Sequence, residues 1–87
     1  MCKLYGAVFV ENSPAFADFK VYVEDIESFA NVNVFKMDTQ AFANQPGMWY
    51  FTDNRAFADF SIAFVDVKAF ADFSIFYTTF QSLAGCR

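Results

Sequence analysis

The sequence contains no histidine, and this removes the side chain most often used as a general base and as a metal ligand. Leucine occurs only twice, at Leu4 and Leu83, although ordinary helical cores depend on it. No uninterrupted apolar run reaches the ~18 residues of a membrane-spanning helix. The formal net charge is −4, the wrong sign for a protein that binds a phosphate backbone. We therefore expect no nucleic-acid partner and no membrane span.

The residues that are abundant favour strands. Hydrophobic residues make up 56% of the chain and charged residues 18%, which is too apolar for a disordered protein. Fourteen of the 87 residues are phenylalanine, and aromatic and β-branched residues favour β-structure. The composition therefore predicts an all-β protein, and the length predicts a single domain over residues 1–87.

The ends of the sequence carry two further expectations. The N-terminal apolar run does not read as a secretory signal, because Glu11 follows it where a small-residue cleavage site is needed and Lys3 is the only charge before it. We read it as the first strand and expect a cytoplasmic location. Cys2 and Cys86 are too few for a disulfide scaffold. They are predicted to be reduced thiols, with a disulfide joining the chain ends or two chains as the alternative.

A phenylalanine between small residues recurs at a nearly constant spacing. The tetrapeptide small–Phe–Ala–Asp/Asn first occurs at residues 15–18. The central residues of its successive copies are Phe16, Phe29, Phe42, Phe57, Phe70 and the degenerate Leu83, with steps of 13, 13, 15, 13 and 13. The long step contains a two-residue insertion beside Pro46 and Gly47. Repetition of this kind organises the whole chain.

Each copy is followed by a segment rich in β-forming residues. These segments are residues 19–23, 32–35, 48–51, 60–64 and 73–77, with residues 4–10 as a degenerate first copy. Six strands without a linker are therefore expected. Alternation within them predicts that Val21, Val34, Ile62, Ile75 and Trp49 form one inward-facing set.

Two architectures suit a period of 13 residues, which is too short for a strand with a crossover helix. In a narrow β-solenoid of about six coils, each repeat makes one coil and like positions stack at ~4.8 Å. In the alternative, each repeat is one strand of a six-stranded antiparallel meander or small barrel. Stacked aspartates would repel in the solenoid, yet we favour it slightly over the meander.

The repeat resembles that of a family of small, mainly bacterial repeat proteins known only as a domain of unknown function. Their unit reads aromatic-x-Ser-x-Ala-Asp-x-x-Val-Tyr-Val, with one insertion ending in Gly-x-Trp and a closing Ser-x-x-Ala-Gly segment. The matching stretches here are residues 17–23, 28–31, 47–51 and 82–86. The family often has a polar residue where this chain has the repeated phenylalanine. The resemblance implies a repeat fold and no particular activity.

The repeated phenylalanines are the candidate functional residues. They could form a second hydrophobic layer inside the monomer, or an exposed stripe that mediates association. The sequence therefore favours a non-enzymatic structural or interaction module that forms a homodimer or another homo-oligomer. The candidate self-association residues are Phe16, Phe29, Phe42, Phe57 and Phe70.

Two other functions remain as alternatives. Asp and Asn columns at the turns could offer oxygen ligands to Ca²⁺, although no EF-hand spacing is present. A small hydrolytic enzyme is disfavoured, because no histidine can activate the serines. No glycine-rich phosphate-binding motif occurs. We expect no catalytic residues, no metal ligands and no cofactor.

Overall fold

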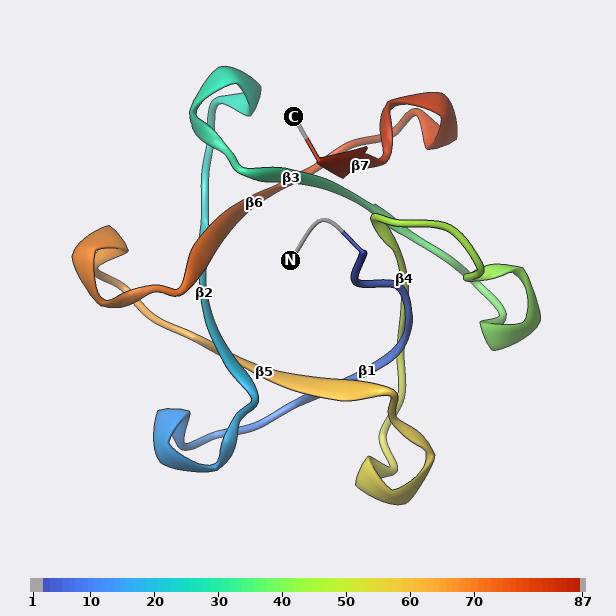
Figure 1. Ribbon diagram of the computed structural model, residues 1–87, viewed down its shortest axis with the longest axis horizontal. Helices are drawn as coiled ribbons and strands as arrows, with labels where there is room; N and C mark the ends of the chain where they lie inside the picture. Colours follow the sequence, from blue (N-terminus) through green and yellow to red (C-terminus); the bar gives the residue numbers. More distant parts are fainter. Residues whose placement is uncertain (1–2, 87) are drawn as a thin grey trace.

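The computed structural model describes residues 3–86, which form short strands joined by single turns of 3₁₀ helix (Figure 1). The strands are β1 (Gly6–Val10), β2 (Phe19–Val23), β3 (Val32–Lys36), β4 (Met48–Phe51), β5 (Phe60–Phe64), β6 (Phe73–Tyr77) and β7 (Gly85–Cys86). The turns are η1 (Pro14–Phe16), η2 (Glu27–Phe29), η3 (Gln40–Phe42), η4 (Arg55–Phe57), η5 (Lys68–Phe70) and η6 (Gln81–Leu83). All six predicted strands are confirmed, and β7 is additional.

The small–Phe–Ala part of each repeat makes the 3₁₀ turn. In the first copy, the N–H of Phe16 donates to the carbonyl of Ser13 at 3.1 Å, and that of Ala17 donates to Pro14 at 3.3 Å. Pro14 occupies the first turn, where its missing N–H removes no bond. Ala17 is extended, so the chain leaves the turn ready to form the next strand. Each turn projects from the sheet as an arm at the rim (Figure 1).

Strands β1 to β6 form a closed parallel ring. The strand order is β4-β1-β5-β2-β6-β3-β7, and a further pairing of β4 with β3 closes the ring. The chain travels around the ring twice, and the strands of the second winding lie between those of the first (Figure 1). The short β7 pairs antiparallel with β3. Consecutive strands are therefore not neighbours, with the exception of β3 and β4.

Each strand shares its length between two partners. In β2, the residues from Phe19 to Val21 pair with β5, and those from Val21 to Val23 pair with β6. The same transfer occurs in β5, where Ile62 ends the pairing with β1 and begins the pairing with β2. The two windings are therefore offset by half a repeat. The ring closes with strands of only four or five residues.

The predicted all-β class and the repeat are confirmed, but the two proposed arrangements need correction. A repeat does not make one coil of a solenoid, because each repeat contributes one strand and one turn, and successive repeats do not stack. The antiparallel pairing of the alternative is also wrong, because β1 to β6 pair in parallel, but the closed, barrel-like arrangement of six strands that it included is present. Parallel pairing needs no crossover helix here. Within one winding, each arm connects a strand to the next strand but one around the ring, and the β3–β4 connection joins two direct neighbours.

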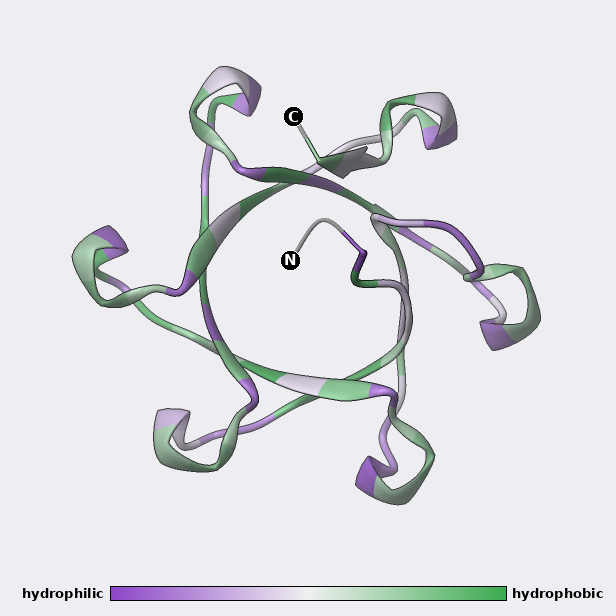
Figure 2. Cartoon of the chain, viewed as in Figure 1, coloured by the Kyte–Doolittle hydropathy of each residue, from purple (hydrophilic) through white to green (hydrophobic). Residues whose placement is uncertain are grey.

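The inward-facing set predicted from alternation forms the core. The fully buried side chains include Val21, Val34, Ile62, Ile75 and, as the largest, Trp49. The ring of Trp49 meets that of Phe60 edge-on, with centroids 5.3 Å apart. Phe19 makes similar edge contacts with Phe60 and Phe73. Figure 2 shows hydrophobic residues along the strands that surround this centre.

The Asp or Asn that ends four of the tetrapeptides completes hydrogen bonding at a strand edge. The N–H of Asp59 donates to the carbonyl of Ala7 at 2.8 Å, and its carboxylate accepts the N–H of Ala7 at 2.8 Å. Asp72 makes the same pair of bonds with Lys20, at 2.7 and 2.7 Å. The side-chain bond recurs between Asp18 and Ser61 and between Asn31 and Ser74. The repeated Asp/Asn is therefore structural, and either residue supplies the needed oxygen.

Replacing Asp59 with alanine is expected to destabilise the fold by about 1–3 kcal/mol, because the N–H of buried Ala7 loses its acceptor. Asp59→Asn retains a side-chain oxygen, as Asn31 does naturally, and should lose clearly less. Urea denaturation of both variants measures the difference. Equal losses from the two substitutions would contradict the capping role.

Cys86 is disulfide-bonded, so the prediction of a reduced thiol is wrong at this position. The prediction for Cys2 lies outside the described residues.

Candidate interaction surface

The repeated phenylalanines lie at the ends of the arms. Their side chains are 59–68% exposed, so they do not form a second layer inside the monomer. The residues are Phe16, Phe29, Phe42, Phe57 and Phe70. Since each belongs to a different arm, the structure places them around the rim rather than in one stripe (Figures 1 and 2). The repeat predicts that the five phenylalanines occupy equivalent positions. The residue type does not show whether those positions are buried or exposed.

A cation closes the gap between arms η4 and η1. The guanidinium of Arg55 donates to the carbonyl of Phe16 at 3.2 Å and forms an ion pair with Glu11. Glu11 directly follows β1. The side chain of Arg55, from the second winding, therefore contacts both arm η1 and the end of β1, which belong to the first winding. The Glu11 side chain is only 13% exposed, which shields this pair from solvent more than a typical surface ion pair.

The gap between arms η5 and η2 is closed in the same way. Lys68 donates to the carbonyl of Phe29 at 3.1 Å and forms an ion pair with Glu24. Lys68 and Arg55 are the first residues of their 3₁₀ turns, 13 positions apart. The two closures are therefore copies of one contact.

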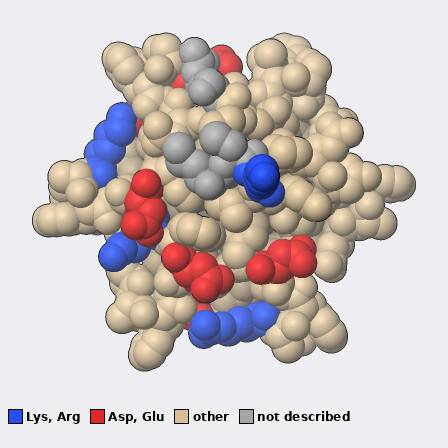
Figure 3. Space-filling view, viewed as in Figure 1, with Lys and Arg blue, Asp and Glu red and all other residues tan. Residues whose placement is uncertain are grey.

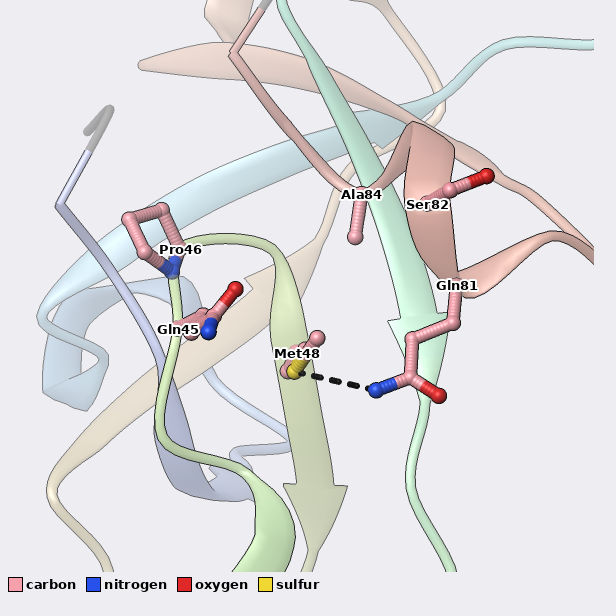
Figure 4. Close-up of a pocket in the computed structure, with 6 residues that line it drawn as sticks. All are labelled: Gln45, Pro46, Met48, Gln81, Ser82 and Ala84. Carbon is pink, nitrogen blue, oxygen red and sulfur yellow. Dashed lines mark hydrogen bonds between the residues drawn. The ribbon is translucent and has the colours of Figure 1, made fainter.

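The third gap of this kind, between η6 and η3, has different residues. The corresponding positions are Gln81 in place of the cation and Met37 in place of the glutamate. The amide of Gln81 instead approaches the sulfur of Met48 at 3.8 Å (Figure 4). The sequence shows that Gln81 and Met37 break the 13-residue pattern of charged residues. This break is the sequence signal that could have located the third gap.

Two adjacent pockets occupy the region of this gap. One has a volume of about 420 Å³ and is lined by Gln45, Pro46, Met48, Gln81, Ser82 and Ala84 (Figure 4). The other has a volume of about 410 Å³ and is lined by Phe35, Lys36, Met37, Asp38, Thr39, Phe42 and Gln81. Gln81 belongs to both. We call the two pockets together the η3–η6 groove.

Lys36 lies beside two aromatic rings at this end of β3. Its ammonium is 4.3 Å from the centroid of Tyr77 and 5.8 Å from that of Phe51. Burial raises the pKa of Tyr77 to about 12, so its hydroxyl is protonated at neutral pH. The arrangement is an uncharged phenol under a cation, and it holds Lys36 at the edge of the groove.

The charged groups provide no evidence for a metal site. Within residues 3–86, no cluster of three or more His, Cys, Asp or Glu side chains could hold an ion. The repeat aspartates bond to backbone N–H groups instead, as with Asp59 and Asp72, so the calcium hypothesis gains no support. Figure 3 shows acidic side chains on the face in view, with Lys and Arg side chains among them.

A search of the described residues for long apolar helices finds none able to cross a membrane. Comparison with curated proteins gives no match, and neither does comparison with solved structures. The 7(1) septoil knot domain is the family whose model matches, over residues 1–87. This agrees with a repeat domain that spans the sequence, whereas the 13-residue consensus of the resembled family stays a prediction. The interleaved double ring and the full-length match lead to one conclusion: the chain belongs to the septoil knot domain family.

Proposed function

We propose that this chain is a non-enzymatic interaction module that self-associates through the aromatic tips of its arms. The observation that carries this proposal is the exposure of five repeated phenylalanines, each 59% or more accessible to solvent. Fully burying one such side chain is worth ~1.5–3 kcal/mol, so contact with another surface would recover a substantial free energy. Further apolar side chains on the arms are also exposed: Ile26, Val67, Phe80 and Leu83.

The construction of the arms supports a binding role over a role in folding. Each tip phenylalanine lies outside the core that Trp49 and Ile62 organise, so the ring is filled without the tips. Four of the five tips, all except that on η3, belong to 3₁₀ turns that two ion pairs and their hydrogen bonds hold in place. Apolar contacts on a pre-positioned scaffold lose little conformational entropy on association. We propose no catalytic activity, because the polar groups of the repeat are used in its own hydrogen bonding.

Sedimentation velocity at micromolar concentrations tests the proposal. We expect the wild-type chain to sediment above its monomer mass of 9.9 kDa in a concentration-dependent manner. Phe42→Ser with Phe57→Ser should shift the population towards the monomer. The matched control changes exposed alanines on the same two arms, Ala41→Ser with Ala56→Ser, and should sediment like the wild type.

Each sample is run with and without a reductant, so that disulfide-linked chains are not counted as non-covalent dimers. A wild-type chain that stays monomeric at the highest soluble concentration would refute self-association.

A further inference from the structure

The η3–η6 groove exists where the chain has lost a contact that it makes twice elsewhere. In the other two gaps, Arg55 or Lys68 reaches the carbonyl of a tip phenylalanine and a glutamate. In the third gap, Gln81 turns towards Met48, and no described side chain donates to the carbonyl of Phe42. In the groove, the carbonyl of Phe42 is therefore an available hydrogen-bond acceptor. The space that an arginine or lysine side chain fills in the other two gaps is open here.

The lining of the groove indicates what could fill it. Both members of the ion pair are replaced by uncharged residues, which favours an apolar occupant over a cation. Phe35, Met37, Phe42 and Met48 supply apolar surface. Methionine adapts its shape to a partner and makes favourable contacts with aromatic rings. An occupant with an aromatic or aliphatic tip and backbone hydrogen-bonding groups would suit this surface.

We propose that the η3–η6 groove receives arm η6 of a second copy of this chain, forming a twofold-symmetric dimer. Arm η6 exposes Phe80 by 64% and Leu83 by 47%, so it presents two apolar side chains. It also forms one wall of the groove. Since arm and groove lie side by side, each copy can insert its arm into the other, and the contact closes on itself. This proposal rests on the self-association proposed above.

The charge distribution favours contact at this place. The chain carries a net charge of −4, so two copies repel at most orientations. Residues 39–42 of arm η3 and 80–83 of arm η6 contain no ionisable side chain. Lys36 and Asp38, which both line the second pocket, offer one charge of each sign that a twofold contact can pair across the axis.

The expected interface is small. A standard interface buries ~800 Å² on each partner, a large share of the 5355 Å² accessible surface of this chain. Arms η3 and η6 must both take part to approach that area. We therefore expect a reversible dimer whose population depends on concentration in the micromolar range.

The decisive variant refills the groove with the contact found in the other two gaps. Met37→Glu with Gln81→Arg places a glutamate and a cation at the spacing of Glu11 and Arg55. The apolar tip residues Phe80 and Leu83 are unchanged, so the variant alters the groove and the first residue of η6 but not the side chains proposed to insert. We expect the dimer dissociation constant, measured by sedimentation velocity, to rise at least tenfold, while the thermal midpoint remains at or above that of the wild type.

A second variant tests the arm. Phe80→Ser with Leu83→Ser should raise the dissociation constant by a similar factor, whereas Ala56→Ser on the distant arm η4 should change it less than twofold. If the wild type dimerises and the refilled variant dimerises equally well, the groove proposal is overturned and the association through arm tips stands. If the refilled variant does not fold, the arm variant alone decides, and unchanged dimerisation again overturns the proposal. A monomeric wild type would overturn both.

Discussion

Trp49→Ala is expected to lower the free energy of unfolding by about 3–5 kcal/mol, a large part of the stability of a small domain. Trp49 is fully buried at the centre of the ring, where its indole contacts Phe60 and Phe51. Each strand of the ring has only four or five residues, so little else can fill the space that the indole leaves. Guanidinium denaturation followed by far-ultraviolet circular dichroism measures the change.

Trp49→Phe is the control for this prediction. It keeps an aromatic ring in the core but loses the hydrogen bond from the indole N–H to the carbonyl of Leu4, 3.2 Å away. We expect it to lose less than the alanine variant. If Trp49→Ala unfolds within ~1 kcal/mol of the wild type, the central role of this side chain is wrong.

Gly47→Ala is expected to prevent β7 from joining the sheet. A Cβ at this position would lie 2.2 Å from the backbone nitrogen of Gly85 and 2.6 Å from the carbonyl oxygen of Asn33. Backbone atoms cannot move aside as the end of a flexible side chain can, and Asn33 and Gly85 form one of the two residue pairs that join β3 to β7. Amide hydrogen exchange across residues 32–34 and 84–86 should accelerate strongly, with a fall in the thermal midpoint.

Gly85→Ala separates the clash from backbone strain. Both glycines have positive φ, +84° at Gly47 and +118° at Gly85, so both substitutions carry a strain of roughly 1–2 kcal/mol. The added Cβ at Gly85 meets only the carbonyl of Pro46, at 3.5 Å. A loss at Gly47 no greater than that at Gly85 would show that the close approach of the two segments is unimportant.

The sequence was sufficient to predict the strands and the core. Periodicity of two within each segment placed Val21, Val34, Ile62 and Ile75 inside, and the structure buries all four. Trp49 was assigned to the same set despite the insertion before it. These predictions succeeded because they depend on residues within one repeat, where alternation and burial are directly linked.

The order of the strands was not predictable by the same reasoning. Repeats that resemble one another can pair in several registers, and a local pattern does not state which copy lies beside which. The two-residue insertion after Phe42 is visible in the sequence, but the spacing alone does not show how it changes the order of the strands. In the structure it precedes β4, where the second winding begins and where consecutive strands pair directly.

The candidate site was only partly predictable. The repeated phenylalanines were identified, yet apolar character alone could not distinguish a buried layer from exposed tips. The groove depends on Met37 and Gln81, which stand out only after Glu11–Arg55 and Glu24–Lys68 are known to be contacts. The members of each pair are 44 positions apart in the sequence. They can be recognised as neighbours only when the offset between the two windings is known.

The interleaving of the two windings also bears on how the chain reaches its native state. Val21 pairs with Phe64 and Phe73, and most other pairings join residues equally far apart in sequence. Closing such long loops costs entropy before any strand contact is gained, so folding should be slow for a chain of this size. Phe35 and Met48 are the nearest paired residues in sequence. We therefore expect β3 and β4, the closest paired strands in sequence, to pair early in folding. The remaining strands would then have to enter between strands that are already in place.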